Sequence, residues 1–366
     1  MADELRIALD AMGGDLGPDE MVAGAVLAVR HEGVTVVLLG DEERLRRAIA
    51  ASGCSTAESN RLEVVHASQV IAMDESPFEA IRRKKDSSIM RAFALHREGR
   101  VQGAVSAGNS GATMAAALKY LGRLEGISRP GIATVFPTLK GPVVMMDVGA
   151  NVDCRPRHLF EFGVMAAAFF RVVYNIDRPR IGLLSIGEEI GKGNILVRKS
   201  HQLFQQSSLN YIGNIEGRET FRGDIDVIVC DGFVGNICLK LSEGLAEVVI
   251  TMLGDEIKQR PSAKLGYLLA RGAFNAFRRR VDYAEYGGAP LLGLQGIGVV
   301  CHGRSSRVAI KNAIRAAAEM SRNRVNDHIV ELLAADGFLA KQAEAAEAAA
   351  AGTAEQSGVD HGEDAA

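Results

Sequence analysis

The sequence has few aromatic side chains: it contains no Trp, and Phe, Trp and Tyr together make up 5% of its 366 residues. Hydrophobic residues nevertheless account for 47% of the chain, so Val, Ile, Leu and Ala must supply most of the core packing. Together with 40 glycines, this composition favours repeated strand–turn–helix units in one large α/β core, or in two lobes that share one sheet.

The chain also has few cysteines and a small net charge. The five cysteines form no CxxC pair, and no set of His, Cys and carboxylate residues has the spacing of metal ligands. We therefore expect neither a zinc site nor a disulfide framework, no metal or other cofactor, and a reducing cytoplasm as the location. A net charge of −3 gives no reason to expect nucleic-acid binding.

Long apolar runs are missing. No run reaches the roughly 18 residues that a membrane-spanning helix needs, and the acidic start Met1–Glu4 does not predict a signal peptide. No predicted strand leads into Gly-x-Gly-x-x-Gly with an acid about 20 residues later, which argues against a Rossmann dinucleotide site.

What the sequence does contain is an alternation of strand-like and helix-like segments. Continuous Val/Ile/Leu runs are typical of a parallel twisted sheet with helices on both faces. We predict strands over 5–10, 34–40, 62–66, 101–107, 132–136, 143–147, 180–187, 209–213, 226–231 and 297–301. We predict helices, with Asp41 and Ser110 as N-caps, over 18–31, 42–52, 77–97, 110–122, 157–174, 194–206, 236–253 and 305–335.

Three predicted strands end in turns that contain Gly and Asn: Ser106–Gly111, Asp147–Asn151 and Asp231–Asn236. Each turn leads to a predicted helix, and ligands of open α/β sheets bind at the carboxyl ends of the strands. Glycines there let backbone N–H groups face an anion at a helix N-terminus. We therefore predict a phosphate-handling site at one common edge of the sheet.

The segment Ser106–Ala112 is the best anion candidate. It offers two hydroxyls and an amide beside the first N–H groups of an Ala-rich helix, with no Asp or Glu nearby in the sequence. The turn at Gly13 and Gly14 would let the backbone approach a ligand, with Asp10 and Asp15 orienting it or holding a cation. Ordinary tight turns are the alternative for both segments.

Two later loops carry titratable side chains. Residues 187–194 superficially resemble a P-loop, but the glycine spacing is too short and Gly193 replaces the Ser or Thr that would bind Mg²⁺. Nucleoside-triphosphate hydrolysis is therefore disfavoured; Lys192 could still meet phosphate as a point charge, or simply be exposed. His302 could act as an acid or base, or be merely hydrogen-bonded. Three cysteines lie near predicted turns and could carry an acyl group: Cys154, Cys230 and Cys301. The favoured interpretation is that each of them is buried and packs as a small hydrophobic residue.

Residues 257–281 carry seven basic and no acidic side chains, interleaved with Leu and Phe. We expect a protruding helical hairpin insertion at about 255–285. Its cations could steer an acidic protein partner or attract anionic lipid, whereas a solvated hairpin at a dimer interface is the alternative. The candidate contacts are Lys264, Arg271, Phe274, Phe277, Arg278, Arg279 and Arg280.

Several ordered stretches make the sequence recognisable: ALDAMGGDLGP (8–18), SAGNSGA (106–112), DVGANVD (147–153), IGEEIGKG (186–193), CDGFVGN (230–236), and YGGAPLLGL (286–294) with CHG (301–303). Through them the chain resembles the bacterial acyl-acyl-carrier-protein:phosphate acyltransferases of phospholipid synthesis, the PlsX family, over roughly residues 5–335. Ser110 stands where we expect Thr in many relatives, and the hydroxyl is kept.

The resemblance implies transfer of a long-chain acyl group from the thioester of acyl carrier protein, which is strongly acidic, to inorganic phosphate. The acyl phosphate would then be consumed by a membrane glycerol-3-phosphate acyltransferase. The resemblance also implies a fold related to phosphate acetyltransferases and to isocitrate and isopropylmalate dehydrogenases. It further implies a homodimer that is cytoplasmic and peripherally associated with an anionic membrane surface.

We assign phosphate binding to 106–111 with assistance from Lys192. Asn151 and Asn236 would polarise the carbonyl or position the thioester, and His302 would donate a proton. The catalytic candidates are Lys192, Asp231, Asn236 and His302. The substrate-binding candidates are Asp10, Gly13, Gly14, Ser106, Gly108, Asn109, Ser110, Gly111, Asp147, Asn151, Glu188 and Gly232.

Three other functions stay open. A phosphate acetyl- or butyryltransferase acting on coenzyme A thioesters is the main alternative, followed by a non-catalytic membrane scaffold and a hydroxy-acid dehydrogenase. We expect a single α/β catalytic domain over 1–339 and a disordered Ala/Glu-rich tail over 340–366, which has almost no large apolar residue.

Overall fold

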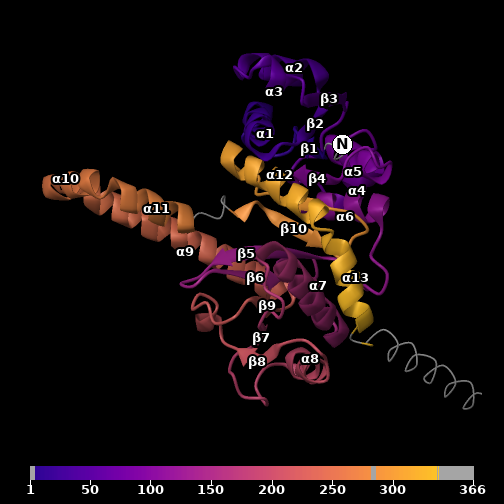
Figure 1. Cartoon of the computed structure of the whole chain (residues 1–366), viewed down its shortest axis with the longest axis vertical. Coiled ribbons are helices and arrows are strands. Elements are labelled where there is room, and N and C mark those ends of the chain that lie inside the picture. Colours follow the sequence, from indigo (N-terminus) through magenta and orange to yellow (C-terminus); the bar gives the residue numbers. More distant parts are fainter. Residues whose placement is uncertain (1–4, 282–285, 336, 338–366) are drawn as a thin grey trace, which may run out of the picture.

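The computed structural model describes residues 5–281, 286–335 and 337 of the chain (Figure 1). Its strands form one sheet of eleven, in the order β3-β2-β1-β4-β11-β10-β5-β6-β9-β7-β8. They are β1 (Arg6–Asp10), β2 (Thr35–Gly40), β3 (Leu62–His66), β4 (Gly103–Ser106), β5 (Gly131–Pro137), β6 (Pro142–Met146), β7 (Ile181–Leu184), β8 (Tyr211–Ile215), β9 (Val227–Val229), β10 (Ala289–Leu292) and β11 (Gly298–Val300).

Helices cover both faces of the sheet. One face packs against α1, α7 and α12, and the other against α5 and α6, because alternate residues of β1 and β4 belong to two different apolar clusters. The helices are α1 (Pro18–Glu32), α2 (Glu42–Ala51), α3 (Thr56–Ser59), α4 (Pro77–Arg83), α5 (Ser88–Arg97), α6 (Ser110–Leu121), α7 (Pro156–Tyr174), α8 (Ile195–Gln205), α9 (Gly232–Gln259), α10 (Pro261–Leu269), α11 (Arg271–Val281), α12 (Arg307–Arg322) and α13 (Val325–Ala335).

Three antiparallel pairings in the middle of the sheet reverse its direction. They are β11–β10, β10–β5 and β5–β6, and the other seven pairings are parallel. The predicted mostly parallel sheet is therefore confirmed. The reversal also means that β1, β2, β3, β4 and β11 end at one edge of the sheet, here called the first edge. Strands β6, β7, β8 and β9 end at the opposite, second edge.

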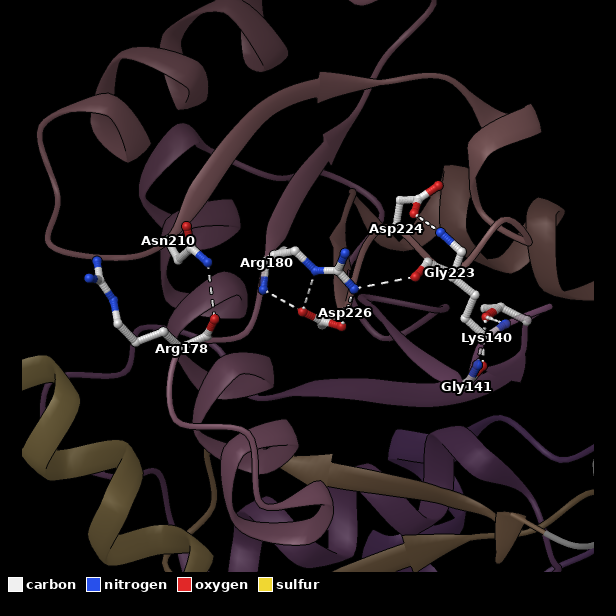
Figure 2. A network of polar contacts seen from close by, with 9 residues as sticks. Lys140, Gly141, Arg178, Arg180, Asn210, Gly223, Asp224 and Asp226 are labelled. Carbon is white, nitrogen blue, oxygen red and sulfur yellow. Dashed lines mark hydrogen bonds and ion pairs between the residues drawn. The ribbon is translucent and has the colours of Figure 1, made fainter.

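An ion pair holds the two strands that start beside each other at the first edge, β7 and β9 (Figure 2). Arg180 donates from Nε and Nη2 to the two carboxylate oxygens of the buried Asp226, both at 2.9 Å. Close by, Lys140 of the β5–β6 turn pairs with Asp224. These contacts place the starts of β7 and β9 at the first edge, so the loops that follow both strands lie at the second.

Ten predicted strands are present, and one was missed. Pro290 lies inside β10 and made this segment an unfavourable strand candidate, but β10 follows a Gly-Gly turn and pairs on both sides. Two predicted helices are wrong as single elements. The range 77–97 is divided into α4 and α5 because Lys84 leaves helical geometry, and 305–335 is divided at Arg324, whose φ is 50°. Asp41 caps α2 as predicted, but α6 is capped by Asn109 rather than Ser110.

The predicted hairpin is larger than expected. It begins with α9, a 28-residue helix that projects from the body of the molecule, and α10 and α11 return along it (Figure 1). Lys264, Arg271 and Phe277 are exposed on the returning helices, and Phe274 packs on Tyr267 with ring centroids 5.0 Å apart. Arg280 instead donates to the backbone oxygens of Thr138 and Leu139. The side chains of Arg278 and Arg279, and the predicted tail 340–366, are outside the described part of the chain.

Candidate functional site

Three loops converge at the first edge, after β1, β4 and β11. The Cys301 N–H donates to the Ser106 oxygen at 2.8 Å, and the Asp15 N–H donates to the Gly303 oxygen at 2.7 Å. The order β1-β4-β11 in the sheet explains this convergence. The Gly13–Gly14, Ser106–Gly111 and His302 segments therefore lie together at this edge.

Asp10 is the buried centre of this group. Its carboxylate accepts from the N–H groups of Met12 and Gly13 at 3.3 and 3.0 Å, and from the Ser106 hydroxyl at 2.8 Å. Burial raises the pKa of Asp10, and the hydrogen bonds oppose that shift. A Cβ on Gly13 would lie 2.6 Å from Asp10 Oδ2 and 2.8 Å from Gly108 N, so only glycine fits. Asp10 and Gly13 thus stabilise the turn after β1 from its buried side.

Ser106 and Asn109 also use their side chains internally. The Ser106 hydroxyl oxygen accepts from the Gly108 N–H at 3.0 Å. Asn109 caps α6 by accepting from the Ala112 N–H at 2.9 Å, and its Nδ2 donates to the oxygens of Met73 and Glu75, both at 3.0 Å. The Asn109 amide therefore ties the segment before α4 to the start of α6 instead of facing outward.

The outward-facing groups of this cluster are those of Ser110, Gly111 and His302. Ser110 and Gly111 are exposed and occupy the first two positions of α6, where the N–H groups have no partner within the helix. His302 is exposed, and its Nδ1 accepts from the Arg304 N–H at 3.1 Å, so the neutral ring carries its proton on Nε2. A helix N-terminus with an exposed hydroxyl suits an anion, and the loop of His302 follows β11, the neighbour of β4.

A second cluster lies at the second edge, after β6 and β9. The buried Asp147 accepts from the N–H groups of Ile132, Ala150 and Asn151 and from Asn151 Nδ2, at 2.6 to 3.3 Å. The Gly232 N–H donates to the Asn151 oxygen at 2.7 Å. Burial raises the pKa of Asp147. These three predicted residues do lie together, and most of their polar groups maintain the loop.

The other second-edge candidates point toward solvent. Asp231 caps α9 through the Val234 N–H at 2.9 Å, and the exposed Asn236 lies in the next turn of that helix against Gly149. After β7, Lys192 is exposed, and Glu188 approaches Arg218 at 3.9 Å. Because β6, β9 and β7 are neighbours, these side chains share one edge.

The prediction of one common edge is wrong for a single chain. Six strand spacings separate β4 from β7, about 29 Å along the sheet, and the two strands end at opposite edges. The physical reason is the reversal produced by the three antiparallel pairings β11–β10, β10–β5 and β5–β6. Lys192, Asp231 and Asn236 therefore do not reach the α6 N-terminus of their own chain.

Sequence reasoning missed the segment Ala72–Pro77, which covers the start of α6. Its signal in the sequence was weak because its contacts with Asn109 are made by backbone oxygens.

Burial raises the pKa of the Cys154 and Cys301 thiols to about 12. Both thiols therefore remain protonated near neutral pH and are poor nucleophiles. Among the residues the structure describes, no group of three or more His, Cys, Asp and Glu could hold a metal ion.

Residues 5–328 match the model of the family described as "Fatty acid synthesis protein". The chain is 56% identical over 329 residues to "Phosphate acyltransferase" of Pelobacter propionicus, covering 90% of this chain and 94% of that one. The protein of the same name from Nitratidesulfovibrio vulgaris is 51% identical over 340 residues, 93% of this chain and 98% of that one. The chain belongs to this family of acyltransferase enzymes, and the resemblance to PlsX is confirmed.

Solved structures support the fold. A phosphotransacetylase from Streptococcus pyogenes matches with a TM-score of 0.60 at 18% identity, covering 88% of this chain and 95% of that one. The EutD phosphotransacetylase from Staphylococcus aureus matches with a TM-score of 0.56 at 17% identity, covering 87% and 94%. At this identity the likeness shows the shared architecture alone.

We expect Asn109→Ala to lower the free energy of unfolding by about 2 to 3 kcal/mol, because it removes one cap and two further hydrogen bonds. Asn194→Ala is the matched control: Asn194 caps α8 through the Val197 N–H alone and is exposed, so we expect a loss of about 1 kcal/mol. Urea denaturation of both variants measures the difference. Equal losses would contradict the role given to Asn109 here.

Proposed function

We propose that this protein transfers a long-chain acyl group from the thioester of acyl carrier protein to inorganic phosphate, and that the acyl phosphate is then used by a glycerol-3-phosphate acyltransferase. The observation that carries the proposal is the exposed N-terminus of α6 with Ser110 and Gly111, next to the loop after β11 that carries His302. The name shared by the relatives, "Phosphate acyltransferase", supports the transfer of an acyl group to phosphate.

The proposed reaction needs placement more than a strong base. A phosphate oxygen attacks the thioester carbonyl carbon, a tetrahedral oxyanion forms, and the C–S bond breaks to release the carrier-protein thiolate. The first N–H groups of α6 and the Ser110 hydroxyl would hold the phosphate. His302 Nε2–H would donate a hydrogen bond to the departing thiolate, which leaves readily because its conjugate acid has a pKa of about 8.5.

The protein would act as a homodimer joined through α9. Gly232 and Gly235 are the buried residues of this helix, whereas an apolar stripe along it is exposed, at spacings of three and four residues: Val234, Ile237, Leu241, Leu245, Val248 and Met252. Such a stripe is the pattern of a helix that packs on another helix. A second copy of α9 would cover it and remove these side chains from water.

The dimer would also complete the site. Because Lys192, Asp231 and Asn236 lie at the second edge, they can act on a phosphate at the first edge only from the other protomer. Lys192 would then add a positive charge that Ser110 and His302 do not supply. In this arrangement Asn236 would position the thioester and Asp231 would orient the start of α9.

Helices α9, α10 and α11 form a protrusion, and its far end would meet the carrier protein and the membrane surface. Lys264 and Arg271 are exposed there, together with Leu265, Leu268 and Leu269. An acidic carrier protein would be steered by these cations, and anionic lipid would be attracted by about 1 kcal/mol for each basic residue near it. Among the described helices, none is both long and apolar enough to cross a bilayer.

We expect palmitoyl-carrier protein to lose its thioester only when phosphate is present, with the acyl phosphate trapped by hydroxylamine. Ser110→Ala should lower kcat/KM for phosphate by about 10- to 100-fold, because one hydrogen bond to a charged ligand is lost. Ser52→Ala, at an exposed hydroxyl that bonds the Ile49 oxygen, is the control. Turnover of acetyl-CoA in preference to palmitoyl-carrier protein would favour the phosphate acetyltransferase alternative.

Mixing two inactive variants tests the shared site. Ser110→Asp places a negative charge at the phosphate position, and Lys192→Ala removes the cation. If each site uses both chains, equal mixing after dissociation and reassociation should restore about a quarter of the wild-type activity, because half of the dimers keep one intact site. A mixture as inactive as its components would show that the two edges do not cooperate.

Charge reversal at the protrusion tests the docking surface. Lys264→Glu with Arg271→Glu should weaken sedimentation with anionic liposomes at least about tenfold, or raise KM for acyl-carrier protein, or both. The control reverses two exposed cations elsewhere, Arg97→Glu with Arg178→Glu. Unchanged sedimentation together with unchanged KM would reject both uses of the surface.

A further inference from the structure

The start of α6 is flanked by large apolar side chains that face water. Phe78 is 77% exposed, Leu16 49% and Met73 47%. All three belong to segments that touch the proposed phosphate site: Leu16 follows Asp15, Met73 lies in the segment bound by Asn109, and Phe78 follows the first residue of α4. We name Leu16, Met73 and Phe78 the apolar lip.

The apolar lip lies close to the segments proposed to hold phosphate. A Cβ on Gly111 would lie 2.6 Å from Pro77 Cγ, so the residue before Phe78 is in direct contact with the second residue of α6. Met73 Cε would lie 3.1 Å from a Cβ on Gly303, the residue after His302. Helix α4, which carries Phe78, packs beside α6 (Figure 1).

Polar contacts hold the segment in this position. Lys84 Nζ donates to the Val70 oxygen at 2.7 Å and to Glu75 Oε1 at 2.5 Å, and Glu75 Oε1 also accepts from the Ala72 N–H at 2.6 Å. Beneath it, Ile71 is buried against Ala80 and Ala112. The exposure of Met73 and Phe78 thus does not come from a loose loop. A fixed backbone presents them outward.

We infer that the apolar lip binds the first methylenes of the acyl chain of the thioester substrate. This inference rests on the proposed function and names its chain-length determinant. The acyl carbonyl must lie within attacking distance of the phosphate, so its alkyl chain begins next to Phe78 and Met73. That chain is uncharged, as the three side chains of the lip are, and its burial would remove Phe78 and Met73 from water.

A chain-length comparison tests the inference. We expect wild-type protein to use palmitoyl-carrier protein better than acetyl-carrier protein, because each methylene that becomes buried is worth about fourfold in kcat/KM. Phe78→Ala should lower kcat/KM for the palmitoyl substrate about tenfold and change the acetyl value by less than about twofold, because an acetyl group has no methylene to bury. Phe78→Leu should restore most of the palmitoyl activity. Ile212→Ala, at an exposed apolar residue on the remote strand β8, should change neither.

The outcomes separate the inference from the proposed function. If wild-type protein shows no phosphate-dependent turnover with either substrate, the proposed function fails and the inference falls with it. If wild-type protein turns over but Phe78→Ala lowers both substrates equally, or neither, the apolar lip does not bind the chain, while the proposed function stands. Loss of liposome binding by Phe78→Ala without any change in chain-length preference would assign Phe78 to the membrane and overturn the inference.

Discussion

Three successive antiparallel pairings, β11–β10, β10–β5 and β5–β6, are the constraint on which the rest of the structure depends. Because their number is odd, they reverse the sheet, so strands β1 to β4 and β11 send their turns to one edge and strands β6 to β9 send theirs to the other. Each edge then assembles its own group of polar loops: Asp10, Ser106 and Asn109 at one, Asp147 and Asn151 at the other. A catalyst that uses both groups needs a second chain.

The two groups are built on the same principle. In each, a carboxylate at the end of a strand is buried and accepts hydrogen bonds from the backbone of the following turn, and a glycine lets a neighbouring loop approach it closely. The carboxylate oxygens of Asp10 and Asp147 are therefore occupied by hydrogen bonds from backbone N–H groups. What remains for a ligand is the outer layer, Ser110 and His302 at the first edge and Lys192 and Asn236 at the second.

Much of the fold could be predicted from the sequence, because the continuous Val/Ile/Leu runs of buried parallel strands are a local signal, and ten strands were located from it. The strand β10 carries Pro290 and lacks that signal, so this strand was missed. The direction of half the sheet was missed because it depends on which strands become neighbours, and three neighbouring pairs are antiparallel. The site was predicted only in part. The Gly/Asn turns are visible in the sequence, whereas the bonds from Asn109 to backbone oxygens at Met73 and Glu75 depend on tertiary packing.

A crystal structure of the dimer with orthophosphate would show whether the two edges of the sheet form one shared site. We predict one phosphate at the N-terminus of α6, within hydrogen-bond distance of the Ser110 hydroxyl of one protomer and of the Lys192 Nζ of its partner. A phosphate held at the second edge by residues of a single chain, or a dimer in which Lys192 lies far from the partner's α6, would contradict it.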